Sequence, residues 1–191
     1  MSDGAALNSA PVVIEAIDAP TLDQHIDALG AILNGCVHDG ASVGFILPFG
    51  MDAARRFFRE SVRPALAGGK RIVLVAKING QVVGTGQLNL DTMPNQMHRA
   101  DVMKVLVYPR YQRRGIGRAL MAELEQIARR LGRTVLVLDT IAGDKAEPLY
   151  LSLGYEVAGR IPLYARAARE DKLETTSVMF KVLDANLRKT L

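Results

Sequence analysis

Cysteine, tryptophan and long apolar runs are scarce or missing in this 191-residue chain. The single cysteine, Cys36, cannot form an internal disulfide, and one thiol with three scattered histidines cannot assemble a cysteine-based zinc cluster. We therefore expect no metal. No apolar run reaches the roughly 20 residues that a membrane helix needs. The first residues, MSDGAALNSAP, carry an acid where a secretory signal carries basic residues. We expect a cytoplasmic protein without a membrane segment.

Charge and aromatic content argue against a nucleic-acid-binding module. Lysine and arginine number 24 against 20 acids, giving a formal net charge of +4, and aromatic residues make up only 5%. Four arginines nevertheless fall within nine residues: Arg110, Arg113, Arg114 and Arg118. No base-stacking motif accompanies them, so this cluster needs another explanation.

Length and composition indicate one globular domain. Hydrophobic residues make up 49% of the chain, and no internal repeat or Pro-, Gly- or Ser-rich linker divides it. Residues 1–10 are small and polar and are predicted to be flexible, and residues 11–191 are predicted to form the domain.

The N-terminal part of the domain is predicted to contain a strand, two helices and a loop. The strand is Val12–Ala16, and Thr21 is placed to cap the first helix. The second helix begins at Asp52 and stops at Gly68-Gly69. Between the helices, residues 38–45 are too glycine-rich for a helix and too apolar for an ordinary surface loop. We interpret this segment as a loop beside a ligand.

A β-hairpin follows these helices. Apolar runs at Ile72–Ala76 and Val82–Leu88 flank Asn79-Gly80, the strongest short hairpin signal. A third strand, Ala100–Val107, is closed by Pro109, which lacks an amide for a continuing ladder.

The C-terminal part alternates helices with short strands. A long helix with one apolar stripe begins at Ile116, and a short helix over 145–153 has Asp144 and Glu147 in capping-box spacing. The remaining strands are predicted at 135–138, 155–158 and 177–182, with a long loop between the last two. Together these elements predict an α/β (α+β) fold in which helices cover a mixed sheet.

The junction of strand and long helix, residues 105–120, carries the most informative chemistry. The first amides of a helix have no internal partner and the helix dipole adds positive charge there, so the site favours an anion. Gly115 and Gly117 let the anion approach the backbone. A P-loop would need Gly-Lys-Ser/Thr, and a dinucleotide fingerprint would need a glycine or alanine where Leu120 stands. The alternative is a helix that merely begins with glycine and carries arginines for solubility.

This junction resembles the GNAT superfamily of N-acetyltransferases. Gln112–Gly117 matches the family signature Q/R-x-x-G-x-G/A, and Ala146–Tyr155 is similar to the later A-x-x-L/F-Y-x-x-x-G-F/Y element. The resemblance implies a mostly antiparallel sheet of six or seven strands, flanked by about four helices and splayed between the fourth and fifth strands. It also implies acetyl-CoA as cosubstrate. The residues that it implies for binding acetyl-CoA are Val105, Leu106, Val107, Gln112, Arg113, Arg114, Gly115, Ile116, Gly117, Arg118 and Tyr150.

Three further segments most resemble the tabtoxin-resistance acetyltransferases within this superfamily: Cys36–Phe45, Arg99–Asp101 and Leu138–Thr140. That resemblance implies a general-base role for Asp101 and for Asp139, which the sequence does not rank. The superfamily resemblance implies that Tyr150 protonates the departing thiolate, since a phenol is protonated at neutral pH. For each of these residues a purely structural role is the alternative.

The acceptor is expected to be a primary amine of a small amino-acid-like or toxin-like molecule. His38, Asp39 and Ser42 are candidates to contact it. Cys36 is expected to be buried, which favours direct transfer in a ternary complex over a thiol intermediate. A catalytically silent acyl-CoA sensor is the alternative function. A homodimer is a further expectation.

Overall fold

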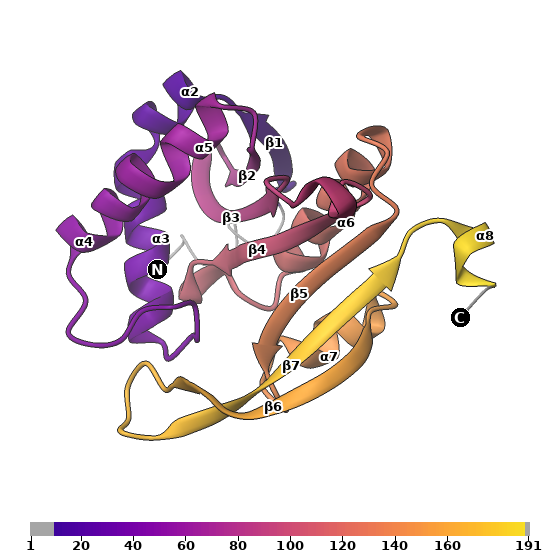
Figure 1. Cartoon of the computed structure of the whole chain (residues 1–191). Coiled ribbons are helices and arrows are strands. Elements are labelled where there is room, and N and C mark those ends of the chain that lie inside the picture. Colours follow the sequence, from indigo (N-terminus) through magenta and orange to yellow (C-terminus); the bar gives the residue numbers. More distant parts are fainter. Residues whose placement is uncertain (1–9, 190–191) are drawn as a thin grey trace.

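Seven strands form one mixed sheet in the order β1-β2-β3-β4-β5-β7-β6 in the computed structural model of the protein, which describes residues 10–189 (Figure 1). All neighbouring strands run antiparallel except the parallel pair β4 and β5. The predicted fold class is therefore confirmed. The strands are β1 Val13–Ile17, β2 Arg71–Ile78, β3 Gln81–Asn89, β4 Arg99–Val107, β5 Val135–Ile141, β6 Glu156–Arg166 and β7 Leu173–Val182.

Helices cover both faces of the sheet (Figure 1). One face holds α6, and the other holds α3 with the continuous run α4-η1-α5, in which η1 is a π-helical stretch. The helices are α2 Ala19–Gln24, α3 Ile26–His38, α4 Met51–Arg56, η1 Phe57–Val62, α5 Arg63–Ala67, α6 Ile116–Arg130, α7 Glu147–Ser152 and α8 Ala185–Arg188, with short 3₁₀ turns η2 Pro94–Gln96 and η3 Pro109–Tyr111.

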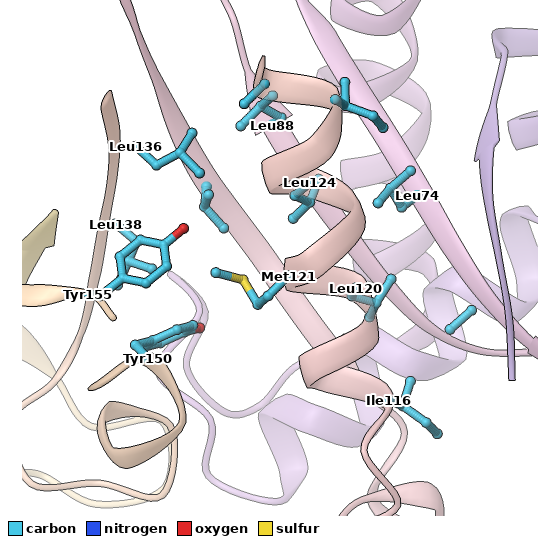
Figure 2. Packing of buried hydrophobic residues seen from close by; sticks show 14 of the residues in the cluster. Leu74, Leu88, Ile116, Leu120, Met121, Leu124, Leu136, Leu138, Tyr150 and Tyr155 are labelled. Carbon is cyan, nitrogen blue, oxygen red and sulfur yellow. The ribbon is translucent and has the colours of Figure 1, made fainter. Parts of the chain in front are cut away.

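The apolar stripe of α6 forms the larger core against the sheet. Figure 2 shows Met121 and Leu124 of α6 among Leu74, Leu88 and Leu136 of the strands. All five side chains are fully buried, and each contributes about 1.5–3 kcal/mol by leaving water. This packing fixes where the N-terminus of α6 lies relative to β4.

The predicted hairpin between β2 and β3 is confirmed. Asn79 and Gly80 both have positive φ, 50° and 77°, as a type I′ turn requires of its two central residues. The turn sets the antiparallel register that extends from Ile78↔Gln81 to Arg71↔Asn89.

The sheet splays between β4 and β5, as the resemblance implied. These strands pair only over Arg99–Asp101, opposite Val135–Val137, and then separate (Figure 1). β5 remains paired with β7 to its end at Ile141. The later part of β4 therefore presents an edge without a β5 neighbour.

A β-bulge lies on β4 at this splay. Thr85 of β3 pairs with Leu106 and Gln87 pairs with Met103, so Gly86 alone faces both Lys104 and Val105. Lys104 takes a positive φ of 50°, which is uncommon for a residue with a side chain. The bulge redirects the Lys104 side chain at the point where the two strands part.

Three local expectations were wrong. The cap of α2 is Asp18, whose Oδ1 accepts the N–H of Thr21 at 2.9 Å, rather than Thr21 itself. The capping box before α7 does not form, since Ala146 occupies the N-cap position and makes no side-chain cap. The long loop after Ala158 is instead strand, because β6 continues to Arg166 through the irregular register around Pro162.

Other expectations concern the ends of the chain and membranes. The predicted flexible segment, residues 1–10, lies outside the described residues apart from Ala10. Within the described range of 10–189, no helix has both the length and the apolar character to cross a bilayer.

Candidate active site

A cleft of about 730 Å³ opens at the splay, between β4, β5 and the beginning of α6. Its lining comes from segments that are far apart in the sequence. These are Cys36, Asp39, 41–44, 102–107, 111–113, 115–118, 138–141, 144–146, 148–150, Ser152, 164–165 and Thr176.

One end of the cleft is the glycine loop, residues 112–118, which leads from η3 into α6. Arg113 and Gly115 have φ of 63° and 78°, and such left-handed residues turn successive amides toward a common concavity. The first bond of α6 runs from the N–H of Ala119 to the carbonyl of Gly115 at 3.0 Å. The amides of Ile116 and the two residues after it therefore have no acceptor within the helix, which suits an anion.

The two glycines of this loop have different surroundings. A Cβ on Gly115 would meet nothing within 4 Å, whereas one on Gly117 would lie 3.3 Å from Cδ2 of Leu149. Gly115 keeps the cradle open and supplies its left-handed conformation. Gly117 also allows α6 to pack closely against α7.

The four arginines divide into two pairs. Arg110 and Arg114 place their guanidinium carbons 4.9 and 5.3 Å from the ring centroid of Tyr111. Arg113 and Arg118 line the cleft instead, and Nη2 of Arg118 donates to the Ser152 hydroxyl at 2.8 Å. The second pair is therefore better placed for a ligand in the cleft.

The last residues of β4, Val105, Leu106 and Val107, line the cleft beyond the pairing with β5. The Val107 carbonyl accepts the Cys36 thiol at 3.4 Å and Nε2 of Gln112 at 3.3 Å. Burial raises the pKa of the Cys36 thiol to about 12, so it stays protonated at neutral pH. The expectation that Cys36 is buried is confirmed.

Tyr150 projects from α7 into the cleft. Burial, followed by the charge of Asp139, raises its pKa to about 12, so the phenol keeps its proton at neutral pH. Its ring centroid lies 6.0 Å from that of Tyr155, and Figure 2 shows both rings beside Met121. Tyr155 is part of the core and its hydroxyl is buried without a hydrogen-bond partner among residues 10–189.

The structure places the two candidate acids differently. Asp139 lines the cleft from within β5, which continues past it to Ile141. Asp101 sits where β4 still pairs with β5, forms an ion pair with Arg99, and accepts Nδ2 of Asn89 at 3.3 Å. Asp101 is not among the lining residues. The structure therefore brings Asp139, and not Asp101, together with Tyr150.

The three candidates for the acceptor lie around the end of α3. Asp39 and Ser42 line the cleft, and His38 does not. Nδ1 of His38 donates to the Asn34 carbonyl at 2.9 Å. Nζ of Lys145 donates a hydrogen bond to Oδ2 of Asp39 at 3.1 Å, and this ion pair links the loop after α3 to the loop before α7. We use the term side-chain half for the part of the cleft lined by Asp39, Ser42, Lys104, Asp139 and Tyr164.

Sequence reasoning missed Lys104 and Glu147. Lys104 is the only charged residue within the apolar run of residues 102–107, and this lone charge is the sequence signal that could have identified it. Glu147 is a buried carboxylate that accepts the Ser177 hydroxyl at 2.7 Å and the Gly143 amide at 2.6 Å, and these bonds lower its pKa. It fixes α7, and with it Tyr150, on β7. Its partners on the strands, Ser177 and Arg160, are too distant in sequence to have been predicted.

Comparisons with known proteins agree with this geometry. The model described as the acetyltransferase (GNAT) family matches residues 45–155, more than half of the chain. The ribosomal-protein-alanine N-acetyltransferase of Brucella melitensis is 25% identical with a TM-score of 0.71, covering 90% of this chain and 99% of that one. YncA of Salmonella typhimurium, solved with its cofactor acetyl-CoA, is 24% identical with a TM-score of 0.72, covering 91% and 95%. An N-acetyltransferase of Staphylococcus aureus Mu50 is 18% identical with a TM-score of 0.74, covering 92% and 100%.

Proposed function

The chain belongs to the acetyltransferase (GNAT) family, and from that premise we propose that it moves the acetyl group of acetyl-CoA to the primary amine of a small amino-acid-like molecule. The observation that carries this proposal is the convergence, in one cleft, of the glycine loop, Tyr150 and Asp139. Among the described residues, no group of three or more His, Cys, Asp or Glu side chains is arranged to hold a metal ion.

The cleft fits coenzyme A through its main chain. Acetyl-CoA supplies an acetyl group activated as a thioester. The amides of the glycine loop would hold its diphosphate, since each hydrogen bond to a charged oxygen is worth about 1.5–3 kcal/mol. Arg113 and Arg118 add positive charge around it. The edge of β4 at residues 105–107 would pair with the pantetheine arm as an added strand does.

Asp139 is assigned as the general base. An alkyl amine with the pKa of lysine is mostly protonated at pH 7, and freeing its lone pair costs roughly 4–5 kcal/mol. The Asp139 carboxylate attracts that ammonium and accepts its proton, directly or through a water. Asp101 is less suited because Arg99 and Asn89 already hold its carboxylate.

Tyr150 is assigned as the general acid. Its phenol retains a proton at neutral pH because burial raises its pKa to about 12. From α7 it donates that proton to the departing thiolate sulfur. Cys36 stays a thiol and is an unsuitable nucleophile, which favours direct transfer within a ternary complex.

The acceptor would occupy the side-chain half of the cleft, where Asp39 and Ser42 are placed to contact it. The resemblance of residues 36–45 to the tabtoxin-resistance acetyltransferases supports an amino-acid-like acceptor. A homodimer stays a prediction, supported by the edge strand β6, on which Ile161 and Leu163 are 43% and 68% exposed.

The test is release of coenzyme A thiol from acetyl-CoA in the presence of amino acids, dipeptides, polyamines and aminoglycosides. We expect at least one amine to give turnover that saturates. The buried Cys36 thiol should contribute no background to a thiol reagent. Tight binding of acetyl-CoA with no turnover for any amine would instead favour the acyl-CoA sensor.

A further inference from the structure

Lys104 is a cation in the side-chain half of the cleft to which the proposed coenzyme A binding and the proposed chemistry give no role. It projects from the β4 bulge, and its Nζ lies 5.9 Å from the ring centroid of Phe45 and 5.8 Å from that of Phe57. The two rings lie 5.3 Å apart, edge to face. Phe45 comes from the loop after α3 and Phe57 from the π-helical stretch, so two separate elements meet on this one ammonium.

Packing alone does not explain a lysine at this position. Its ammonium takes part in none of the ion pairs or hydrogen bonds found within residues 10–189, although it has three protons to donate. Burial lowers its pKa, and the positive charge of Arg71 adds to that effect. An uncharged chain of the same length would avoid this desolvation cost. The charge is therefore retained at a cost in stability, as is common at functional sites.

The charges that face the side-chain half are few. Asp139 supplies a negative charge that acts on Lys104 and partly opposes the lowering of its pKa. Asp39 and Lys145 pair with each other. Among the residues that define the side-chain half, Lys104 and Asp139 are the two charged ones in no ion pair within residues 10–189, and they lie on neighbouring strands that have separated. Asp144 also lines the cleft, from the loop before α7. A ligand complementary to this arrangement carries an ammonium and an acidic group together.

We propose that Lys104 binds a carboxylate of the acceptor, so that the enzyme acetylates amino acids in preference to polyamines or aminoglycosides. This inference rests on the proposed function and deepens it. The acceptor amine faces Asp139, and the acceptor carboxylate receives the Lys104 ammonium. Phe45 and Phe57 contact the ammonium and hold it in place in the free enzyme.

The experiment compares matched acceptors on matched variants. Each amino acid that gives turnover is assayed beside its carboxamide and beside the amine that lacks the carboxylate. Lys104→Met should raise KM for the amino acid roughly 10- to 100-fold, the loss expected for one charge-assisted hydrogen bond, with KM for acetyl-CoA unchanged. The carboxamide and the simple amine should be poor acceptors for wild type and should respond little to the substitution. Lys104→Arg should restore part of the affinity.

Two controls separate charge recognition from folding. Lys70→Met removes a surface lysine that pairs with Asp91 and should leave every KM unchanged. Lys104→Met should melt at or above the wild-type temperature, because it removes a partly buried charge. If it does not fold, Lys104→Gln makes the same comparison.

Several outcomes would overturn the inference. These are equal KM values for the acid and its carboxamide in wild type, unchanged discrimination in Lys104→Met, or a panel in which no carboxylate-bearing amine gives turnover. Turnover with polyamines alone would reject the role of Lys104 while leaving the proposed acetyltransferase in place. Failure of every amine would reject both.

Discussion

The two ends of the cleft are built from different material. The glycine loop, residues 112–118, is one continuous stretch whose binding groups are main-chain amides at the beginning of α6. The side-chain half takes Asp39, Lys104 and Asp139 from three elements far apart in the sequence. A main-chain site needs only a few residues with particular backbone angles and leaves a short local motif. A side-chain site depends on the fold to bring its parts together and leaves no motif.

This difference also separates what each end does. The glycine loop would hold the part of coenzyme A that every acyl-CoA enzyme of this kind must hold. The side-chain half would decide which amine is accepted. Substitutions in the glycine loop should therefore change the Kd for coenzyme A, and substitutions in the side-chain half should change the KM for the acceptor. Substitution of Tyr150, which lies between the two ends, should change neither affinity.

The largest effect is expected from a negative charge in the glycine loop. Gly115→Asp should raise the Kd for coenzyme A at least about 100-fold, because a carboxylate would repel the diphosphate and compete for the amides. The asparagine in Gly115→Asn has the shape of aspartate without its charge and tolerates positive φ equally well. This variant should therefore raise the Kd for coenzyme A roughly tenfold or less. Calorimetric titration measures both values. Gly115 is preferred to Gly117 because its Cβ would meet no neighbour within 4 Å. Equal losses in the two variants would show that shape, and not charge, matters.

Removing the phenol of Tyr150 should be the next largest change. Tyr150→Phe should lower kcat roughly 10- to 1000-fold with little change in the Kd for coenzyme A, since a placed general acid acts only in the transition state. Tyr155→Phe is the matched control, because the Tyr155 hydroxyl is buried without a partner among the described residues. It should keep full activity. Unaltered turnover in Tyr150→Phe would remove Tyr150 from the chemistry.

Substitution of Asp139 should reduce activity more than substitution of Asp101. Asp139→Asn should lower kcat/KM for the acceptor roughly 10- to 100-fold at pH 7. Asp101→Asn should leave kcat/KM within about threefold of wild type and lower the Tm slightly, since it weakens the ion pair with Arg99. Initial rates and thermal melts of both variants check this. The reverse ranking would move the base to Asp101 and place it in a state of the enzyme in which the Arg99 pair is broken.

The smallest effect is expected at Cys36. Burial raises the pKa of this thiol to about 12, so a thiol reagent at pH 8 should label the single cysteine only after the protein is unfolded. Cys36→Ala should keep turnover within about threefold of wild type. Rapid labelling of the native enzyme with loss of activity would revive transfer through a thiol.

Local signals in the sequence were reliable where the backbone decides the structure. Asn79-Gly80 predicted the hairpin, and the stripe on residues 116–130 predicted α6. Gly115 and Gly117 were both expected to leave space beside the backbone, and at Gly115 a Cβ would indeed meet nothing within 4 Å, whereas at Gly117 it would meet Leu149. The length of β6 was missed because Pro162 reads as a loop residue, whereas an edge strand tolerates it.

Expectations failed, or remained open, where distant parts meet. The sequence could not rank Asp101 against Asp139, because the ranking depends on where the sheet splays. It could not reveal Glu147, whose partners come from β6 and β7, or the ring pair around Lys104. These features exist only once the chain has folded.

The most direct test of the central claim is a crystal structure of the enzyme with coenzyme A. We predict that the diphosphate is held by the main-chain amides of residues 113–118 and that the pantetheine arm runs along residues 105–107. Coenzyme A held chiefly by side chains elsewhere, with the glycine loop empty or closed, would contradict the account.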